Sequence, residues 1–223
     1  MAKTAVLCSA GLDSAVLVAA EARTSRVQPL YVSVGLGWED AESQALARLT
    51  RSDAFAGVDP VVSLRFDMTD VYPPGHWAIE GRPPAYDTPD EDVYLAGRNL
   101  VLLTKGGVFC ASTAVHHRLA LGILAGNPFP DATPAFLDAL GRAMSLGLHH
   151  PIQIAAPFSG MHKSEVILLG MELGVPLGLT LSCMSPTPDA RHCGSCSKCR
   201  ERRDAFHEAG VSDPTEYAAP APR

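Results

Sequence analysis

Short apolar runs alternate with amphipathic stretches along most of the chain. Strands are expected over five apolar runs, at 4–8, 27–34, 61–66, 118–125 and 152–155. Helices are expected where apolar positions recur at helical spacing or a capping signal stands, at 12–22, 39–51, 98–117, from 134 onward, 162–173 and 197–209. Strands that alternate with helices predict an α/β fold, a doubly wound parallel sheet covered on both faces.

The stretch 70–92 interrupts this alternation. It holds five prolines, two glycines and several charged residues, a composition typical of a long surface loop. We expect a mobile loop, either a lid over a site or a poorly ordered insertion. The pattern divides the chain into an α/β domain over 1–175, a C-terminal region over 176–213 and a frayed tail over 214–223.

The first strand is followed by Ser9-Ala10-Gly11-Leu12-Asp13-Ser14 and then by a helix. A strand, a loop of small residues and a helix together aim backbone N–H groups at an anion such as a phosphate. Asp13 would repel a phosphate unless it helps to hold Mg²⁺ bridging the phosphate oxygens. The plain alternative is a tight turn that binds nothing.

Composition narrows the classes of function. The chain has 223 residues, 47% of them hydrophobic, so it can bury a sizeable core. Its net charge of −6 argues against a broad basic surface for nucleic acid or membrane. Asp13 interrupts the first apolar run and prolines interrupt 143–161, so we expect no signal peptide, no membrane helix and a cytoplasmic protein.

Four of the six cysteines stand close together, with the spacing C-x9-C-x2-C-x2-C; they are Cys183, Cys193, Cys196 and Cys199. Two overlapping Cys-x-x-Cys steps present sulfurs to one centre, and Cys183 can complete a tetrahedron. We expect a structural zinc site, with an iron–sulfur cluster as the competing interpretation. Cys8 and Cys110 stand in apolar surroundings and are expected in the core.

Two features carry a resemblance to known proteins. The loop 9–14 resembles the SGGxDS loop of ATP pyrophosphatases, with Ala10 at the second glycine. Further blocks resemble the 7-cyano-7-deazaguanine synthase family of queuosine biosynthesis. They are 97–99, 126–127, Pro157 with 162–165, and 180–183 leading to the cysteines 193, 196 and 199.

The resemblance implies an ATP pyrophosphatase fold with a C-terminal zinc region, often dimeric. It implies that a 7-carboxy-7-deazaguanine carboxylate attacks the α phosphate of ATP, that ammonia displaces AMP to give an amide, and that a second ATP converts the amide to the nitrile. Asp13, Arg98 and Lys163 are the candidate catalytic residues, because charge on the leaving pyrophosphate needs cations and Mg²⁺.

The candidate ligand-binding residues follow from the same match. For ATP they are Ser9, Ala10, Gly11, Leu12, Asp13, Ser14, Val32, Gly126 and Lys163. For the substrate they are Arg98, Asn99, Phe129 and Asp131, with Phe129 suited to stack on a planar ring and Asp131 to accept from its N–H donors.

One segment departs from the family pattern. Where the family carries Gly-Tyr-Pro-Asp-Cys, this chain has Asn127-Pro128-Phe129-Pro130-Asp131-Ala132, without the Tyr and the Cys. A related enzyme that activates another carboxylate, or joins a deazapurine acid to another amine, is therefore an alternative. A tRNA sulfur transferase shares the ATP loop but usually needs a basic surface. A zinc module that binds nucleotide without catalysis is the remaining alternative.

Overall fold

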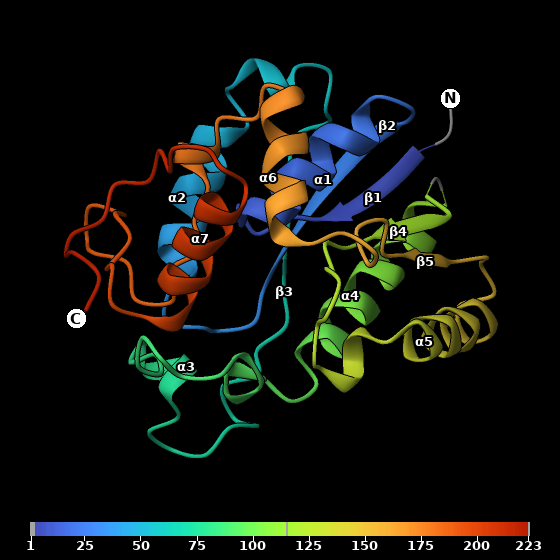
Figure 1. Cartoon of the computed structure of the whole chain (residues 1–223). Helices are drawn as coiled ribbons and strands as arrows, with labels where there is room; N and C mark the ends of the chain where they lie inside the picture. Colours follow the sequence, from blue (N-terminus) through green and yellow to red (C-terminus); the bar gives the residue numbers. More distant parts are fainter. Residues whose placement is uncertain (1–2, 115, 223) are drawn as a thin grey trace.

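The computed structural model describes residues 3–114 and 116–222. It has one sheet of five parallel strands (Figure 1), which confirms the predicted α/β class. The strands are β1 (Lys3–Leu7), β2 (Arg26–Ser33), β3 (Val62–Arg65), β4 (Arg118–Ala120) and β5 (Gln153–Ala155). Their order is β3-β2-β1-β4-β5. The strand order therefore reverses between β1 and β4, which is the switch point of the sheet. In parallel sheets of this kind, ligands bind beyond the carboxyl ends of the strands at the switch point.

Seven helices accompany the sheet in the described residues: α1 (Leu12–Ala22), α2 (Glu39–Leu49), α3 (Trp77–Glu80), α4 (Arg98–Thr113), α5 (Pro134–Gly147), α6 (Lys163–Glu172) and α7 (Ser197–Glu208). Short 3-10 turns stand at 53–55, 90–93, 130–132 and 177–179. The predicted start of α5 is confirmed, since the Thr133 side chain accepts a hydrogen bond from the amide of Phe136.

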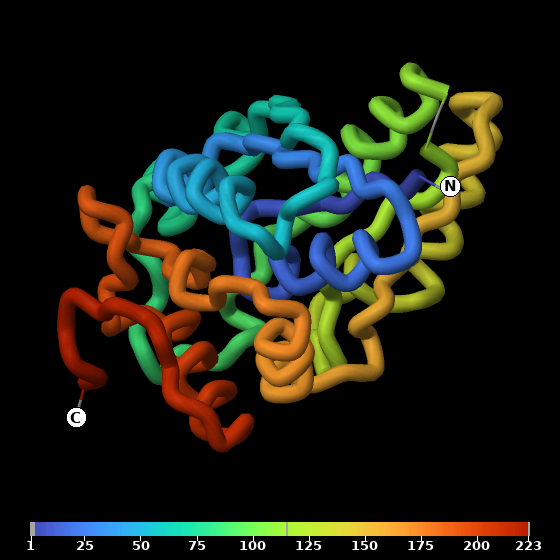
Figure 2. The backbone as a smooth tube through the Cα atoms, turned by 90° about the horizontal axis from the view of Figure 1, so that it is seen from above, coloured from blue at the N-terminus to red at the C-terminus, as the bar shows by residue number. Residues whose placement is uncertain are grey.

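Consecutive strand residues face opposite sides and build two cores. Val6 and Ala120 join a cluster with α1, α2, α6 and α7, whereas Ala5 and Leu119 join a second cluster with α4 and α5. The buried cysteines of the C-terminal region belong to the first cluster. In Figure 2 this region, drawn in orange and red, lies at the end of the molecule opposite α5. Because its cysteines share a cluster with residues of β1, α1 and α6, the C-terminal region packs against the α/β core.

Several predicted boundaries differ from the structure. The helix expected over 98–117 ends at Thr113, because Ala114 adopts φ 54°, a left-handed conformation that stops a helix. The strand expected over 118–125 pairs only as far as Ala120. The stretch 70–92 contains the short helix α3. The tail is paired rather than frayed where the amide of His192 donates to the Glu216 carbonyl and the amide of Ala218 to the His192 carbonyl.

Within residues 3–114 and 116–222, no helix combines the length and the apolar character that crossing a membrane requires.

Candidate active site

The loop between β1 and α1 lies at the carboxyl edge of the sheet. Gly11 is the residue before α1, and no side chain of the described residues caps this helix start. The first amides of α1 therefore remain available to an anion. Ala10 has φ 64°, in the left-handed region that favours glycine, which explains why the related loop carries glycine at this position. The Ala10 carbonyl accepts from the amide of Leu181 (2.9 Å), so the backbone of the C-terminal region supports the loop.

Charged side chains from α1, α6 and α7 meet beside this loop. The Lys163 Nζ atom lies 3.4 Å from Asp13 Oδ2 and forms a second ion pair with Glu201. Lys198 Nζ approaches the other Glu201 oxygen at 2.5 Å. A lysine at a helix start opposes the helix dipole, and the two carboxylates supply the negative charge that Lys163 needs there.

The network fixes the charge states of its members. Burial opposes the charge of Lys163, but Asp13 and Glu201 outweigh it and raise the pKa of this lysine. Burial also opposes the charge of Glu201, yet Lys163 and Lys198 lower its pKa to about 2. Burial raises the pKa of Asp13 even though Lys163 acts in the opposite direction. Lys163 therefore stays charged beside the loop that follows β1.

Asp13 also suits a magnesium ion. Its Oδ1 atom is buried and has no hydrogen-bond partner among the described residues, while Oδ2 faces Lys163. A buried carboxylate oxygen without a partner is costly unless something binds it. Mg²⁺ prefers such oxygens and usually shares its other positions between water and phosphate. The donor set thus fits the predicted role of Asp13.

Two adjoining cavities open at this edge of the sheet. The first, about 370 Å³, is lined by Trp77 and Asp90 of the long loop and is called here the loop cavity. The second, about 320 Å³, is lined by Leu7, Leu30 and Val32 of the strands and is called the strand cavity. Nine residues line both: Ser9, Gly11, Asp13, Glu42, Arg98, Gly122, Asn127, Phe129 and Lys198. The cavities therefore meet at the loop after β1.

Most of the predicted site residues converge on these cavities. Among the candidates, Leu12, Gly126 and Lys163 line the loop cavity. Ser14, Val32 and Asn99 line the strand cavity. Ala10 and Asp131 are absent from the lining that the described residues form, although Ala10 belongs to the loop itself.

Asn99 and Asp131 bind each other. The backbone amide of Asn99 donates to Asp131 Oδ2 (3.2 Å), and its side-chain amide donates to Oδ1 (3.2 Å). Asp131 is buried, and it accepts these hydrogen bonds from the first turn of α4, where the negative charge of a carboxylate stabilises the helix start. This pair holds Arg98, the first residue of α4, at the cavities. Direct contact of Asn99 or Asp131 with a substrate stays a prediction.

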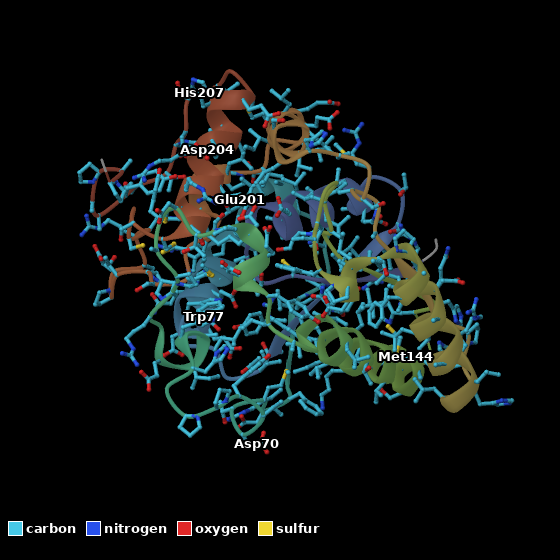
Figure 3. All side chains as sticks on the ribbon, turned by 60° about the horizontal axis from the view of Figure 1, so that its bottom comes forward. Asp70, Trp77, Met144, Glu201, Asp204 and His207 are labelled. Atoms are coloured by element: carbon cyan, nitrogen blue, oxygen red, sulfur yellow. The ribbon has the colours of Figure 1, made fainter. Side chains whose placement is uncertain are left out.

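The long loop is attached to α7. Arg200 donates to the carbonyls of Tyr86 (2.9 Å) and Thr88 (3.1 Å) and lies 3.6 Å from Asp90. Trp77 of α3 and Glu201 of α7 both line the loop cavity and lie on one side of the molecule, away from Met144 of α5 (Figure 3). The loop therefore forms one wall of the loop cavity, and the C-terminal region holds it there.

Apart from Asp90 of the long loop, three charged residues of the cavities were missed by sequence reasoning: Glu42, Lys198 and Glu201. A signal existed for Glu42, which stands at helical spacing from the buried Ala45, Leu46 and Leu49 and so faces inward. Lys198 and Glu201 carried no such signal, because they lie in a charged helix and meet Lys163 only through the fold.

The four clustered cysteines form a second candidate site. Their sulfur atoms all lie within 4.8 Å of one another, so they can hold a metal ion. Cys183 Sγ accepts from the amides of Ser185 (3.3 Å) and Cys193 (3.2 Å), as a thiolate would. Gly194 has φ 86°, and a β-carbon there would come 2.1 Å from the Ala219 carbonyl oxygen, so this turn requires glycine. Cys8 and Cys110 lie in the core, as predicted.

Comparisons with known proteins show the family to which this chain belongs. Residues 3–210 match the family described as "Queuosine biosynthesis protein QueC". The 7-cyano-7-deazaguanine synthase of Methanopyrus kandleri is 33% identical over 97% of this chain and 99% of its own length. The protein of the same name from Anaeromyxobacter dehalogenans is 34% identical over 97% of this chain and 96% of its own. The chain belongs to the QueC family of queuosine biosynthesis proteins.

Proposed function

We propose that this protein is an ATP-dependent 7-cyano-7-deazaguanine synthase. The observation that carries the proposal is the loop cavity, where Asp13, Lys163 and Arg98 from three helices meet at the carboxyl end of β1. Family membership supplies the substrate, since the full-length relatives bear the name of this synthase. Under this proposal 7-carboxy-7-deazaguanine and ammonia are converted to the nitrile, with release of AMP and pyrophosphate.

The chemistry places defined demands on the chain. A carboxylate becomes electrophilic only when one of its oxygens is bonded to a good leaving group, here AMP, and pyrophosphate leaves in that step. Ammonia then adds and AMP leaves, which gives an amide. The amide oxygen attacks the α phosphate of a second ATP, which releases pyrophosphate and a proton. Loss of AMP and a second proton then leaves the nitrile. Each adenylation builds negative charge on the departing pyrophosphate. Groups that bind this charge more strongly in the transition state than in the ground state therefore accelerate the adenylation.

The side chains of the cavities suit these demands. The amides at the start of α1 and the cations Lys163 and Lys198 would stabilise the phosphates. Asp13 would hold Mg²⁺, which supplies further charge stabilisation. The wall formed by the long loop would exclude water, which protects an acyl-adenylate from hydrolysis. Val32 and Gly126 would contact ATP, and Phe129 would contact the substrate ring.

The cysteine cluster is proposed to hold a structural Zn²⁺. Four thiolates in a closed set leave no open position for a substrate, as is typical of structural zinc sites. We also expect a homodimer in the cytoplasm, in keeping with the resemblance.

Mass spectrometry of a reaction mixture tests the proposal. The protein is incubated with 7-carboxy-7-deazaguanine, ATP, Mg²⁺ and ammonia. We expect the acid to disappear and 7-cyano-7-deazaguanine, AMP and pyrophosphate to form. An adenylate or amide that accumulates would instead indicate a truncated reaction or another amine acceptor. ATP cleavage that needs some other carboxylate would overturn the deazapurine assignment, and cleavage that needs tRNA would favour sulfur transfer.

A further inference from the structure

Glu42 is a buried carboxylate at the junction of the two cavities. It is 7% exposed, and Tyr31 donates to its Oε2 atom at 3.1 Å. Glu39, one turn earlier on α2, accepts three hydrogen bonds, from the Ser33 hydroxyl (2.6 Å) and the amides of Val34 (2.7 Å) and Gly35 (3.0 Å). Glu39 thus binds the turn after β2, whereas Glu42 lines the space where ligands are proposed to bind.

The surroundings of Glu42 disfavour its negative charge. Burial raises its pKa to about 7; Arg98 opposes the shift and Glu39 adds to it. An amide of the same shape would avoid this cost to folding. A carboxylate kept in a cavity at such a cost points to a ligand that needs it.

Arg98 lines the same two cavities as Glu42 and is also incompletely bound. Its Nε atom is buried and finds no hydrogen-bond partner among the described residues. Arg98 lines both cavities, and its charge is the strongest influence lowering the pKa of Glu42. The guanidinium offers several donors in one plane and no acceptor, while a carboxylate offers only acceptors. The two side chains therefore present an acceptor group and a donor group to the same cavities.

This pair matches one edge of the proposed substrate. Along that edge, 7-carboxy-7-deazaguanine presents the 2-amino group and the N1–H as donors, then the ring carbonyl, and then the 7-carboxylate on the neighbouring side. Adenine presents an acceptor and an amino group on the corresponding edge, so a paired carboxylate and guanidinium fit it poorly. The rings of Trp38 and Trp77 stack at 6.0 Å and both line the loop cavity, which gives a planar ring apolar surface to pack on.

We propose that Glu42 is the specificity residue of the substrate ring, accepting hydrogen bonds from its N1–H and 2-amino groups, while Arg98 donates to the ring carbonyl and the 7-carboxylate. The inference rests on the proposed function and names the residues that select its substrate. It assigns to Glu42 the acceptor role that the sequence suggests for Asp131, whose oxygens are both engaged by Asn99.

Equilibrium binding in the absence of ammonia tests the assignment. Calorimetry compares 7-carboxy-7-deazaguanine with 7-carboxy-7-deazahypoxanthine, which lacks the 2-amino group. In the wild type we expect the analogue to bind about 10- to 100-fold more weakly, because a buried acceptor loses its donor. In Glu42→Gln the side-chain oxygen can accept from one ring donor, but the NH2 group faces the other donor and repels it. We therefore expect the acid to lose a similar factor and the two ligands to bind within about threefold of each other.

Matched measurements keep the result interpretable. Glu39→Gln changes a neighbouring carboxylate whose hydrogen bonds, among the described residues, go to the turn after β2. This variant should retain the full preference for the 2-amino group. The ATP affinity of Glu42→Gln should stay near that of the wild type, and its melting temperature should be no lower. Unchanged acid binding in Glu42→Gln, a loss confined to kcat, or a loss of ATP affinity instead of acid affinity would each overturn the assignment.

A second ligand pair separates this inference from the proposed function. The protein is titrated with 7-deazaguanine and 7-deazaadenine, neither of which carries the carboxylate. If the acid is neither bound nor converted, the proposed function fails. A preference for 7-deazaguanine that Glu42→Gln abolishes would still support the role of Glu42. No preference in the wild type would overturn it.

Discussion

The cysteine cluster and the two cavities both contain buried polar atoms, yet the partners of these atoms differ. In the cluster the sulfurs face one another and accept from backbone amides. In the cavities Asp13 Oδ1 and Arg98 Nε lack partners among the described residues, and Glu42 has a raised pKa. A site completed by one metal ion is suited to stability, whereas a site that keeps unpaired groups is suited to binding ligands that come and go.

Cys196→Ser is expected to have the largest effect on stability, because it removes one of the four candidate metal ligands. We predict loss of the bound zinc and a fall in solubility and melting temperature, because structural zinc contributes about 10 kcal/mol or more to folding in isolated zinc peptides. Zinc content is measured by elemental analysis and stability by calorimetry. Cys110→Ser, in the core outside the cluster, is the control and should keep its zinc. A stable but inactive Cys196→Ser would show that the cluster takes part in the chemistry.

Asp13→Ala tests the opposite kind of site. We predict a loss of pyrophosphate release of about 10³-fold or more, as expected when a group that stabilises developing charge is removed. The melting temperature should change little, because Lys163 keeps its partner Glu201. Glu21→Gln, on the same helix but paired with Arg118, is the matched control and should retain activity. Release near the wild-type rate in Asp13→Ala would mean that Asp13 has another role.

Glu42→Gln should show, through the pH dependence of stability, how much the buried charge of Glu42 destabilises the fold. The folded pKa of Glu42, about 7, lies above its ordinary value of 4.5, so its contribution to stability is present below pH 4.5 and is lost as pH rises through 7. Relative to the wild type, Glu42→Gln should gain on the order of 2–3 kcal/mol in unfolding free energy between pH 4.5 and pH 8. The groups facing Glu42 are Tyr31, Glu39, Arg98 and Trp38.

Denaturant unfolding of both proteins across this pH range measures the difference. Subtracting the two curves removes the titrations that they share. Glu39→Gln loses hydrogen bonds to the β2 turn and should be destabilised at both ends of the range. A difference between Glu42→Gln and the wild type that stays flat with pH would show that Glu42 is not a strained carboxylate.

Arg200→Ala tests the connection between the two regions and should have the smallest effect. The variant removes the bonds from α7 to the carbonyls of Tyr86 and Thr88. We expect KM for the acid to rise about tenfold and kcat to change less, since roughly 1.4 kcal/mol of binding corresponds to that factor. Arg191→Ala, which removes only an exposed pair with Asp189, is the control. An unchanged KM would mean that the loop closes the cavity without this attachment.

The sequence predicted local features well. The spacing of the four cysteines and the capping of α5 by Thr133 are properties of neighbouring residues, and both appear in the structure. The alternation of strands and helices likewise identified the parallel sheet. In each case the signal lies within a few residues of chain.

Features that depend on tertiary contacts were not predicted. Glu201 is separated from Lys163 by 38 residues, and Arg200 from Thr88 by 112, so no local pattern indicates either contact. The end of α4 was also missed, because the left-handed conformation of Ala114 occurs in a residue that favours helices. The residues of the cavities had to be found from the fold.

Under the proposed function, a substrate carboxylate attacks the α phosphate of ATP in these cavities. Synthesis with a carboxylate carrying oxygen-18 in both positions tests this step, with mass spectrometry of every product. We predict that both labelled oxygens appear in AMP, one in each of two molecules, while pyrophosphate and the nitrile carry none. Labelled phosphate with ADP, or AMP without label, would contradict it.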